Sequence, residues 1–431
     1  MKLRSMKKRI IGSIWASMMA IVAFSQSGTN SPYSQYGFGV LADQSQGFSR
    51  GMNGVGLGLR KGNVVNTLNP ASYSAVDSLT MMFDVSMSGQ MTNFKEGGKR
   101  VNAKNADFDY AVGLFRMMPN FGVSFGVLPF SNIGYQYGST RSLENASITM
   151  TETYDGDGGF HQVFLGAGWR IAKPLSVGFN AAYLWGNYSR NFSSVGSESQ
   201  VLTVSKVYTA DISSYKLDFG LQWQQPITKK DELVLGLTFG LGHKLGANPS
   251  CIINTTDAST SISRSDTLSA GNVLELPMSY GIGLSWVHRN KLFVGADLTM
   301  QKWGSVSYPS EVGDGYVGCP NLLIDNYKAS VGADYVPNPT SRRFLHRVHY
   351  KVGAGFATPY YKINGQDGPK EISVSAGFGI PLQNAYNNRS MLNVSAQWVR
   401  TSAKDLITDN TFRLTVGLTF NERWFAKWKI D

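Results

Sequence analysis

The chain has 431 residues, of which 16% are charged and 12% are aromatic, and it contains 47 glycines. Soluble globular chains carry about 25% charged residues, so this composition argues against an ordinary soluble protein. Beyond the N-terminal leader, no segment has the roughly 20 consecutive apolar residues that a spanning helix needs, which argues against a helical membrane protein. The net charge of +11 includes five basic residues in that leader. The remaining basic residues form no stripe of the kind that binds nucleic acid.

Residues 1–25 have the features of a secretory signal peptide. Five basic side chains in positions 2–9 precede an apolar stretch at 10–24, and small residues at 23 and 25 fit cleavage before Gln26. No Cys follows the cleavage site, which argues against a lipid-anchored protein. The apolar stretch is short for the alternative, a membrane anchor.

Residues 26–78 form an N-terminal extension and a segment rich in Gly, Asn and Ser. Two stretches stand out in it, Arg50-Gly51-Met52 and Asn69-Pro70-Ala71. The glycines could suggest a phosphate-binding loop, but the strand-to-helix setting that such a loop needs is absent. We interpret the segment as plug-like, because it lies before the first predicted strand and shows no strand periodicity of its own.

Residues 79–420 alternate large apolar side chains with small or polar ones. At 233–242, for example, Leu233, Leu235 and Leu237 alternate with Val234 and Gly236. Successive side chains of a strand point to opposite faces, and an apolar-out, polar-in alternation is typical of a transmembrane β-barrel. The pattern predicts an all-β antiparallel barrel of about fourteen strands, near 79–92, 107–116, 121–136, 160–171, 175–191, 214–223, 233–245, 273–287, 291–304, 326–336, 347–361, 371–380, 390–400 and 410–420.

The connectors between these strands alternate in length. Short turns such as 117–120 and 172–174 follow the even strands, and longer polar loops follow the odd ones, at 137–159, 192–213, 246–272 and 305–325 for example. Outer-membrane barrels have short periplasmic turns and long extracellular loops, so this alternation predicts the orientation in the outer membrane of a Gram-negative bacterium. A soluble β-sandwich is the alternative, but its outer face would not be so consistently Gly and Ser.

The chain ends with residues 421–431, which carry three aromatic residues after the last predicted strand. Amphipathic aromatic side chains are favoured at membrane interfaces, so we expect this tail to lie at the periplasmic interface.

A hatch with Asn69-Pro70-Ala71 just before the first of fourteen strands resembles the FadL/TodX family of outer-membrane transporters for hydrophobic compounds. The resemblance implies that the hatch, including Arg50, Gly51 and Met52, fills the lumen. It also implies that hydrophobic compounds such as long-chain fatty acids bind among the loops and leave sideways into the membrane through a kink in the third strand. The expected partners are membrane lipid, such a ligand, and the barrel-assembly machinery during biogenesis.

The third predicted strand contains a site for such an opening. Its regular alternation is followed by Leu128, Pro129, Phe130 and Gly134. Proline cannot donate a hydrogen bond to a ladder, so Pro129 must disturb the pairing in a closed barrel. The disturbance is either a lateral opening or a tolerated bulge at the rim.

Alternation also predicts which side chains face the lumen. Mixed charges there suggest ion pairs with one another and with the plug, because buried charges need partners. These pairs either pack the plug statically or release it when a ligand binds. The predicted lumen-lining residues are Asp84, Phe115, Phe164, Arg170, Lys216, Asp218, Phe293, Asp297, Lys328, Asp334, Lys351 and Arg413.

The two cysteines, Cys251 and Cys319, fall in neighbouring predicted extracellular loops. An exported protein can form a disulfide between them, and two unpaired thiols are the alternative. Only five His residues are present, and no nucleophile-base constellation accompanies them. His346 and His349 are spaced so that strand geometry would separate them. We expect no enzymatic activity, metal or cofactor.

Three functions stay open from the sequence. The first is transport of hydrophobic compounds such as long-chain fatty acids through a plugged barrel. The second is a non-transporting barrel that serves as a subunit of a larger outer-membrane complex. A polar-solute porin is the third, and the predicted hatch argues against its open aqueous lumen.

Overall fold

A computed structural model of the chain describes residues 28–78, 80–142, 148–198, 201–382 and 390–423. The predicted signal peptide and most of the predicted C-terminal tail lie outside these ranges. Within them, no helix is both long and apolar enough to cross a membrane.

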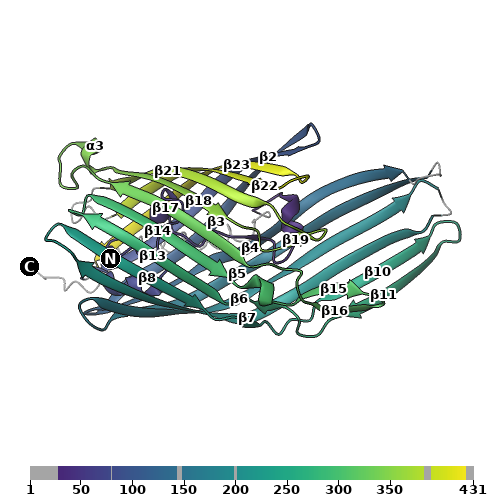
Figure 1. Cartoon of the computed structure of the whole chain (residues 1–431), viewed down its shortest axis with the longest axis horizontal. Helices are drawn as coiled ribbons and strands as arrows, with labels where there is room; N and C mark the ends of the chain where they lie inside the picture. The colour runs from purple at the N-terminus through teal and green to yellow at the C-terminus, as the bar shows by residue number, and fades with distance from the viewer. Residues whose placement is uncertain (1–27, 79, 143–147, 199–200, 383–389, 424–431) are drawn as a thin grey trace, which may run out of the picture.

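Fourteen strands close into an antiparallel barrel (Figure 1). The first and last of them, β2 and β23, pair from Thr80 with Arg423 to Lys95 with Thr408 and so complete the ring. The barrel strands are β2 (Thr80–Glu96), β3 (Lys99–Met118), β4 (Phe121–Ser142), β5 (Thr149–Arg170), β6 (Leu175–Gly196), β7 (Thr203–Pro226), β8 (Asp231–Gly240), β13 (Ser279–His288), β14 (Leu292–Gln301), β17 (Asn326–Tyr335), β18 (His349–Ala357), β21 (Lys370–Leu382), β22 (Ser390–Ser402) and β23 (Thr408–Arg423).

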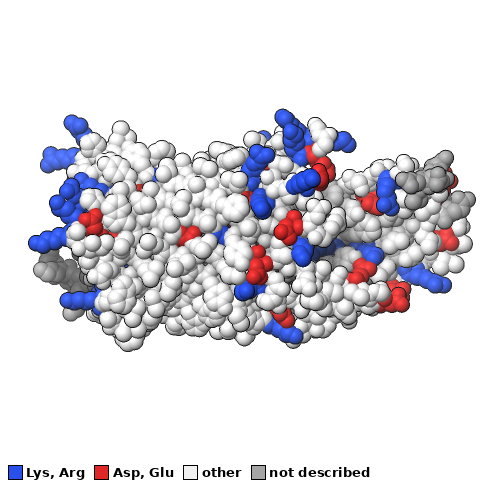
Figure 2. Space-filling model, viewed as in Figure 1, with Lys and Arg blue, Asp and Glu red and all other residues white. Residues whose placement is uncertain are grey.

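The outer face of the barrel is a belt of exposed apolar side chains. Leu165, Ile282 and Phe412 are between 48% and 60% exposed, although such residues are normally buried. Figure 2 shows a nearly uncharged band between two charged ends. Such a band is what lipid requires of a transmembrane barrel, and the small inward residues then leave space for the plug.

One part of the wall rises far beyond this belt. We call β4 to β7, together with β10 (Ser250–Asp257) and β11 (Ile262–Ser269), the tall wall, which extends to the right in Figure 1. β10 pairs with the upper half of β7, and β11 pairs with β10. Predicted loops 137–159, 192–213 and 246–272 are therefore wrong in large part, because the strands continue where their outward residues become polar.

Glycines mark the level at which the tall wall leaves the belt. Gly158, Gly159 and Gly186 have φ of +125°, +149° and +147°, which disfavours any side chain. Gly159 pairs with Asn187, and Gly186 pairs with Phe160, so the three positions lie together across β5 and β6. The wall bends along this line.

Short elements complete the end that the loop lengths predict to be extracellular, which we call the extracellular end; the other is the periplasmic end. These are β9 (His243–Lys244) paired with β12 (Glu275–Leu276), β15 (Tyr308–Val312) paired with β16 (Gly315–Cys319), β19 (Lys362–Ile363) paired with β20 (Gln366–Asp367), and η3 (Trp303–Ser305). The β15–β16 hairpin corrects the prediction of an unstructured loop at 305–325. α3 (Phe344–Arg347) lies in the connection between β17 and β18.

The N-terminal residues fill the barrel. They contain η1 (Pro32–Gln35), β1 (Val40–Leu41), α2 (Gly47–Arg50) and η2 (Pro70–Ala75). α2 and η2 are buried apart from the last residue of η2, although barrel strands surround them. Small inward residues make this possible, because a Cβ on Gly178 would clash with Pro70 and one on Gly236 would clash with Leu57.

Candidate functional site

The wall contains one joint that is paired over only part of its length. β3 pairs with β4 from Met118 with Phe121 up to Ala111 with Val127. Above that level β3 continues to Lys99 with β2 as its neighbour, and β4 continues to Ser142 with β5 as its neighbour. We call the unpaired region between residues 99–110 of β3 and 128–142 of β4 the seam.

Pro129 lies at the level where the seam begins. The register between β4 and β5 shifts between Pro129 and Ser131, so Phe130 is the extra residue of a bulge. The carbonyl of Pro129 accepts a hydrogen bond from Gln44 of the plug at 2.8 Å. The predicted irregularity at Pro129 therefore coincides with a bulge on one side of β4 and the start of the seam on the other.

The chain itself occupies the seam with residues 28–41, which we call the seam segment. β1 pairs with the free edge of β4, Val40 opposite Asn132 and Leu41 opposite Ser131. Farther along β4, Ser34 Oγ accepts a hydrogen bond from the Gly134 N–H and donates one to the Gly134 carbonyl, both at 3.1 Å. A side chain thus satisfies edge groups that a neighbouring strand would otherwise pair.

The start of the seam segment lies between the two edges. A Cβ on Gly28 would clash with Asp107 of β3 and with Asn132 of β4. Gln90 of β2 donates to the Gly28 carbonyl at 2.7 Å. Contacts from both sides therefore place Gly28 inside the gap, where no other residue type would fit without rearrangement.

Ion pairs hold the plug to the wall. Arg50 of α2 donates to Asp109 of β3 at 2.9 Å, and both side chains are almost fully buried. Ser86 and Ser88 of β2 also donate to Asp109, at 2.8 and 2.9 Å. This carboxylate is fully satisfied, as a buried charge must be.

A second contact lies nearer the periplasmic end. Lys61 of the plug pairs with Asp334 of β17 at 2.8 Å, and His349 is bonded to the same carboxylate. The ring of Phe48 lies close to both Lys61 and Lys351, whose Nζ atoms are 4.6 and 3.7 Å from its centroid. A cation that lies over an aromatic face is attracted to the ring electrostatically. This cluster therefore also holds the plug to the wall.

The Asn69-Pro70-Ala71 stretch starts η2 and binds the wall. The Asn69 side chain accepts from the Ala71 N–H at 3.2 Å, a capping bond that satisfies an otherwise free donor. Its Nδ2 donates to the Leu57 carbonyl of the plug at 2.9 Å and to the Leu221 carbonyl of β7 at 3.1 Å. The motif therefore joins two parts of the plug to one strand.

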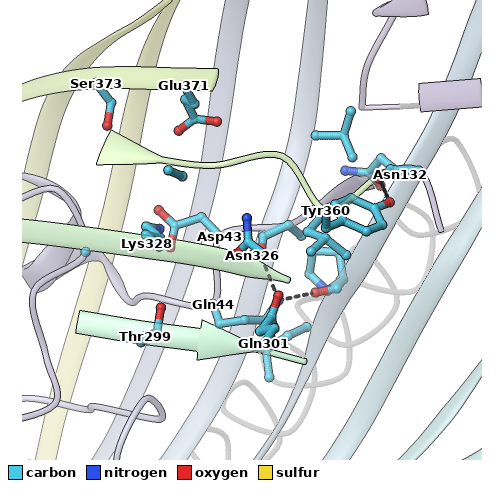
Figure 3. Close-up of a pocket in the computed structure, with 18 of the residues that line it drawn as sticks. Asp43, Gln44, Asn132, Thr299, Gln301, Asn326, Lys328, Tyr360, Glu371 and Ser373 are labelled. Carbon is cyan, nitrogen blue, oxygen red and sulfur yellow. Dashed lines mark hydrogen bonds between the residues drawn. The ribbon is translucent and has the colours of Figure 1, made fainter. Parts of the chain in front are cut away.

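Between the plug and the extracellular loops lies a cavity of about 500 Å³ that reaches the seam (Figure 3). Leu128, Pro129 and Asn132 line it on the seam side. Its other walls are mixed, with apolar side chains such as Leu57, Phe164 and Phe239 lying among amide, hydroxyl and charged groups. The charged lining residues are Asp43, Asp107, Asp109, Asp218, Asp297, Glu371, Asp409, Arg50, Lys216, Lys328 and Arg413.

Acidic groups outnumber basic ones in this lining. Lys328 projects toward Asp43 of the plug in Figure 3. Burial alone would raise the pKa of Asp43, but the positive charges of Lys328 and Arg50 outweigh it and lower the pKa to about 2. Asp43 is therefore ionised at physiological pH, so the mixed lining carries a fixed negative charge on the plug side.

The apolar space at the extracellular end is filled by the chain's own aromatic residues. Phe38 of the seam segment is 1% exposed and lies 5.3 Å from Trp303 and 5.8 Å from Phe160, between ring centroids. Tyr360 accepts from the Phe38 N–H at 3.0 Å. The seam segment therefore takes up room that an apolar ligand would need.

The structure places most of the predicted lumen residues inside the barrel. Asp84, Phe164, Phe293, Asp297, Asp334 and Lys351 are buried, and Lys216 pairs with Asp218. Arg413 bonds Gln90 and Gln397, and Arg170 bonds the Lys173 carbonyl at the periplasmic turn. Asp297 accepts from the plug N–H groups of Gly56 and Leu57, at 2.6 and 2.9 Å.

Phe115 is a correction. It pairs with Met81 and packs edge-on against Phe125, which belongs to the lipid-facing belt, so Phe115 faces outward. The register of β3 against β2 shifts at Ser86, where Asp109 is extra. Asp109 and Tyr110 consequently both face inward, and the alternation changes phase there.

The possible disulfide is not formed, because both cysteines are free thiols. Cys251 is buried beside Glu311 of the β15–β16 hairpin, at 3.8 Å from the carboxylate, and Cys319 is partly exposed. Burial and that carboxylate raise the pKa of Cys251 to about 11. No group of three or more His, Cys, Asp or Glu in the described ranges could hold a metal.

Sequence reasoning missed the residues that matter most for the seam. Asp109 was not predicted to face inward, because a bulge leaves no signal in a period-two pattern. Ser34 and Gln44 lie in segments without periodicity. The two Asp residues at 107 and 109, directly before the apolar stretch 110–115, are the signal that could have indicated Asp109.

Comparison with known proteins decides the family. The chain matches the family model of BamG over residues 6–431.

The chain belongs to the BamG family. No curated protein matches the sequence.

Solved structures match the barrel at low sequence identity. The Ralstonia pickettii toluene transporter TbuX has a TM-score of 0.60 at 13% identity, over 89% of this chain and 99% of that one. The Pseudomonas putida toluene transporter TodX has a TM-score of 0.59 at 14% identity, over 89% of this chain and 100% of that one. A Pseudomonas aeruginosa FadL homologue has a TM-score of 0.59 at 12% identity, over 89% of this chain and 99% of that one. The expected FadL/TodX barrel fold is confirmed.

Proposed function

We propose that this protein is a plug-locked outer-membrane barrel that serves as a subunit of the barrel-assembly machinery. The observation that carries this proposal is the closed interior. The plug is tied to β3 by the buried Arg50–Asp109 pair, and the seam is occupied by residues 28–41. The name of the BamG family, with its reference to barrel assembly, supports the same role.

The charged part of the cavity lining also bears on the choice between a subunit and a transporter. An apolar molecule in the cavity would contact the apolar lining but would also displace water from Asp43, Lys328 and other charged groups. Removing water from charged groups is unfavourable, which weighs against a fully apolar ligand. The tall wall instead offers a large exposed sheet outside the membrane, which is suited to contact with other proteins.

Affinity purification from native outer membranes in mild detergent tests this proposal. The expected result is a stoichiometric complex that contains the central barrel-assembly subunit, and depletion of the protein should reduce the folded, heat-modifiable fraction of other outer-membrane barrels. A protein that purifies alone, with unchanged barrel assembly after depletion, would contradict the proposal.

Transport of hydrophobic compounds is the second candidate, and the seam favours it. The barrel has the fold of hydrocarbon channels, and the seam at Leu128, Pro129, Phe130 and Gly134 offers a lateral exit into lipid. A long-chain fatty acid would then leave through the seam after the seam segment moved.

A disulfide across the seam separates the two candidates. In a Cys251→Ser/Cys319→Ser background, Val40→Cys/Asn132→Cys would lock the seam segment to β4, because the two residues are direct antiparallel partners. Thr92→Cys/Thr411→Cys across the closing joint is the matched control. If the protein transports, fatty-acid entry into proteoliposomes should fall at least tenfold in the oxidised seam variant only and recover on reduction. Native mass spectrometry should also detect retained fatty acid.

A further inference from the structure

A band of basic side chains lies on the outside of the extracellular rim. Four of them, which we call the basic band, are Lys95 on β2, Arg100 on β3, Lys370 on β21 and Arg400 on β22. All four are exposed. Figure 2 shows blue side chains gathered at the upper edge of the molecule, over the β2–β3 hairpin.

Two members of the band follow directly on the lipid-facing belt. Arg400 comes two residues after Trp398, and Lys370 comes two residues before Ile372, so each shares the outward face of its lipid-facing neighbour. Trp398 and Ile372 are 41% and 51% exposed. A step of two residues along a strand is about 7 Å, which places these charges immediately above the hydrocarbon region.

The β2–β3 hairpin continues the band at the same face. Met91 of β2 is 48% exposed, and Lys95 lies four residues beyond it on the same side. Lys95 pairs directly with Arg100 across the hairpin. Between this hairpin and β22, β23 contributes Asn410, which pairs with both Asn93 and Arg400. The band therefore runs across five neighbouring strands, β21, β22, β23, β2 and β3.

The protein does not neutralise this charge. In the described ranges, none of the four residues forms an ion pair with another residue. Glu371, next to Lys370, points into the cavity instead, as expected for alternate faces. Glu96 is the exposed acid at the hairpin tip and leaves the band positive.

The neighbouring tall wall differs in charge. Asp155 and Asp157 of β5 and Asp211 of β7 lie on its outward face, just beyond the level of Gly158 and Gly159. The position of the basic band, at one side and at headgroup height, points to a ligand in the membrane surface.

We propose that the basic band binds the phosphate groups of lipid A in the outer leaflet. Lys and Arg donate charge-assisted hydrogen bonds to phosphate, and Arg does so in a bidentate manner. Long basic side chains at a membrane interface can lay their apolar stems along lipid while the charged ends reach the headgroups. The expected ligand is a phosphorylated lipid held on the outside of β21 to β3, independent of plug and cavity.

Titration of the purified barrel in detergent with phosphorylated lipid A tests the proposal. The variant Lys95→Gln/Arg100→Gln/Lys370→Gln/Arg400→Gln should bind at least tenfold more weakly than the native protein, because each basic residue at a charged membrane surface contributes severalfold to binding. The matched control Lys229→Gln/Lys230→Gln/Arg342→Gln/Arg343→Gln removes the same charge from exposed positions at the periplasmic end. It should bind within twofold of native protein.

Two further arms identify the ligand chemistry. Dephosphorylated lipid A should bind native protein and the band variant equally weakly, and inorganic phosphate at millimolar concentration should not displace the lipid. Heat-modifiable migration of each variant shows that its barrel is folded. Equal binding by native protein and band variant, equally tight binding of the dephosphorylated lipid, or displacement by free phosphate would each overturn the proposal.

Discussion

Two joints of the barrel wall pair their strand edges in different ways. At the closing joint, β2 and β23 pair continuously, so an unbroken main-chain ladder holds the ring together. At the seam, β3 and β4 separate above Ala111 and Val127, and residues 28–41 supply the missing partner. An exposed strand edge is a template for unwanted pairing. The comparison teaches that a barrel can leave part of a joint unpaired if its own N-terminal segment covers the free edge.

The largest expected effect comes from the contact that ties the plug to the seam side. Arg50→Met leaves the buried Asp109 carboxylate without its cationic partner and should lower the free energy of unfolding by about 3 kcal/mol. Denaturant unfolding followed by heat-modifiable migration measures this. Arg50→Met/Asp109→Leu should recover much of the loss, and a double variant as unstable as the single one would contradict the role of the pair.

Ser34 provides the next test. Ser34→Ala removes the hydroxyl that bonds Gly134, so the buried N–H of Gly134 then lacks a partner. The free energy of unfolding should fall by about 1–2 kcal/mol. Hydrogen exchange at Gly134 should accelerate. Thr92→Ala, which removes a side-chain bond to Thr411 at the closing joint, should cost less because the main-chain ladder there remains intact. Equal costs at the two joints would remove the distinction between them.

Acidification should loosen the plug through Asp43. Its pKa is lowered from 3.8 to about 2 by Lys328 and Arg50 against the effect of burial, so the ionised form stabilises the folded protein. This stabilisation is complete above about pH 5 and is lost as the pH falls through about 2, by about 2 kcal/mol in all. Stability measured across this range should fall less steeply in Asp43→Asn, and identical slopes would rule out this residue as the cause.

The smallest effect is expected at Pro129. Pro129→Ala restores a backbone N–H, yet the separation of β3 and β4 should persist because β1 occupies the edge at Ser131 and Asn132. We expect the free energy of unfolding to change by no more than about 0.5 kcal/mol. Exchange rates of the β3 amides at 101–108 should stay as in the native protein. Strong new protection there would mean that the proline itself keeps the seam unpaired.

Much of the barrel could be predicted from the sequence, because lipid imposes a strict period-two pattern. Leu233 to Phe239 and Phe412 to Phe420 show this clearly, and both segments are strands with apolar side chains outward. The tall wall could not be predicted as strand, because above the membrane the outward residues become Ser, Thr and Asn. Its strands then resemble polar loops.

The candidate site was only partly predictable for a related reason. Charges such as Asp297 and Asp334 were placed in the lumen because they interrupt an apolar pattern, and the structure gives each a plug partner. The seam segment has no period, and its partners Asn132 and Gly134 are distant in sequence. A bulge at Asp109 reversed the alternation, so the pattern placed Phe115 on the wrong face.

The enclosed plug restricts the order in which the molecule can be built. Asn69 bonds β7, Lys61 bonds β17, and β1 pairs with β4, so contacts to the plug come from strands that are made early and late in synthesis. The wall backbone also lies directly against the plug, at Gly178 beside Pro70 and at Gly236 beside Leu57. We expect the strands to gather around residues 28–78 before the ring closes, so that the plug acts as a core on which the cylinder is assembled.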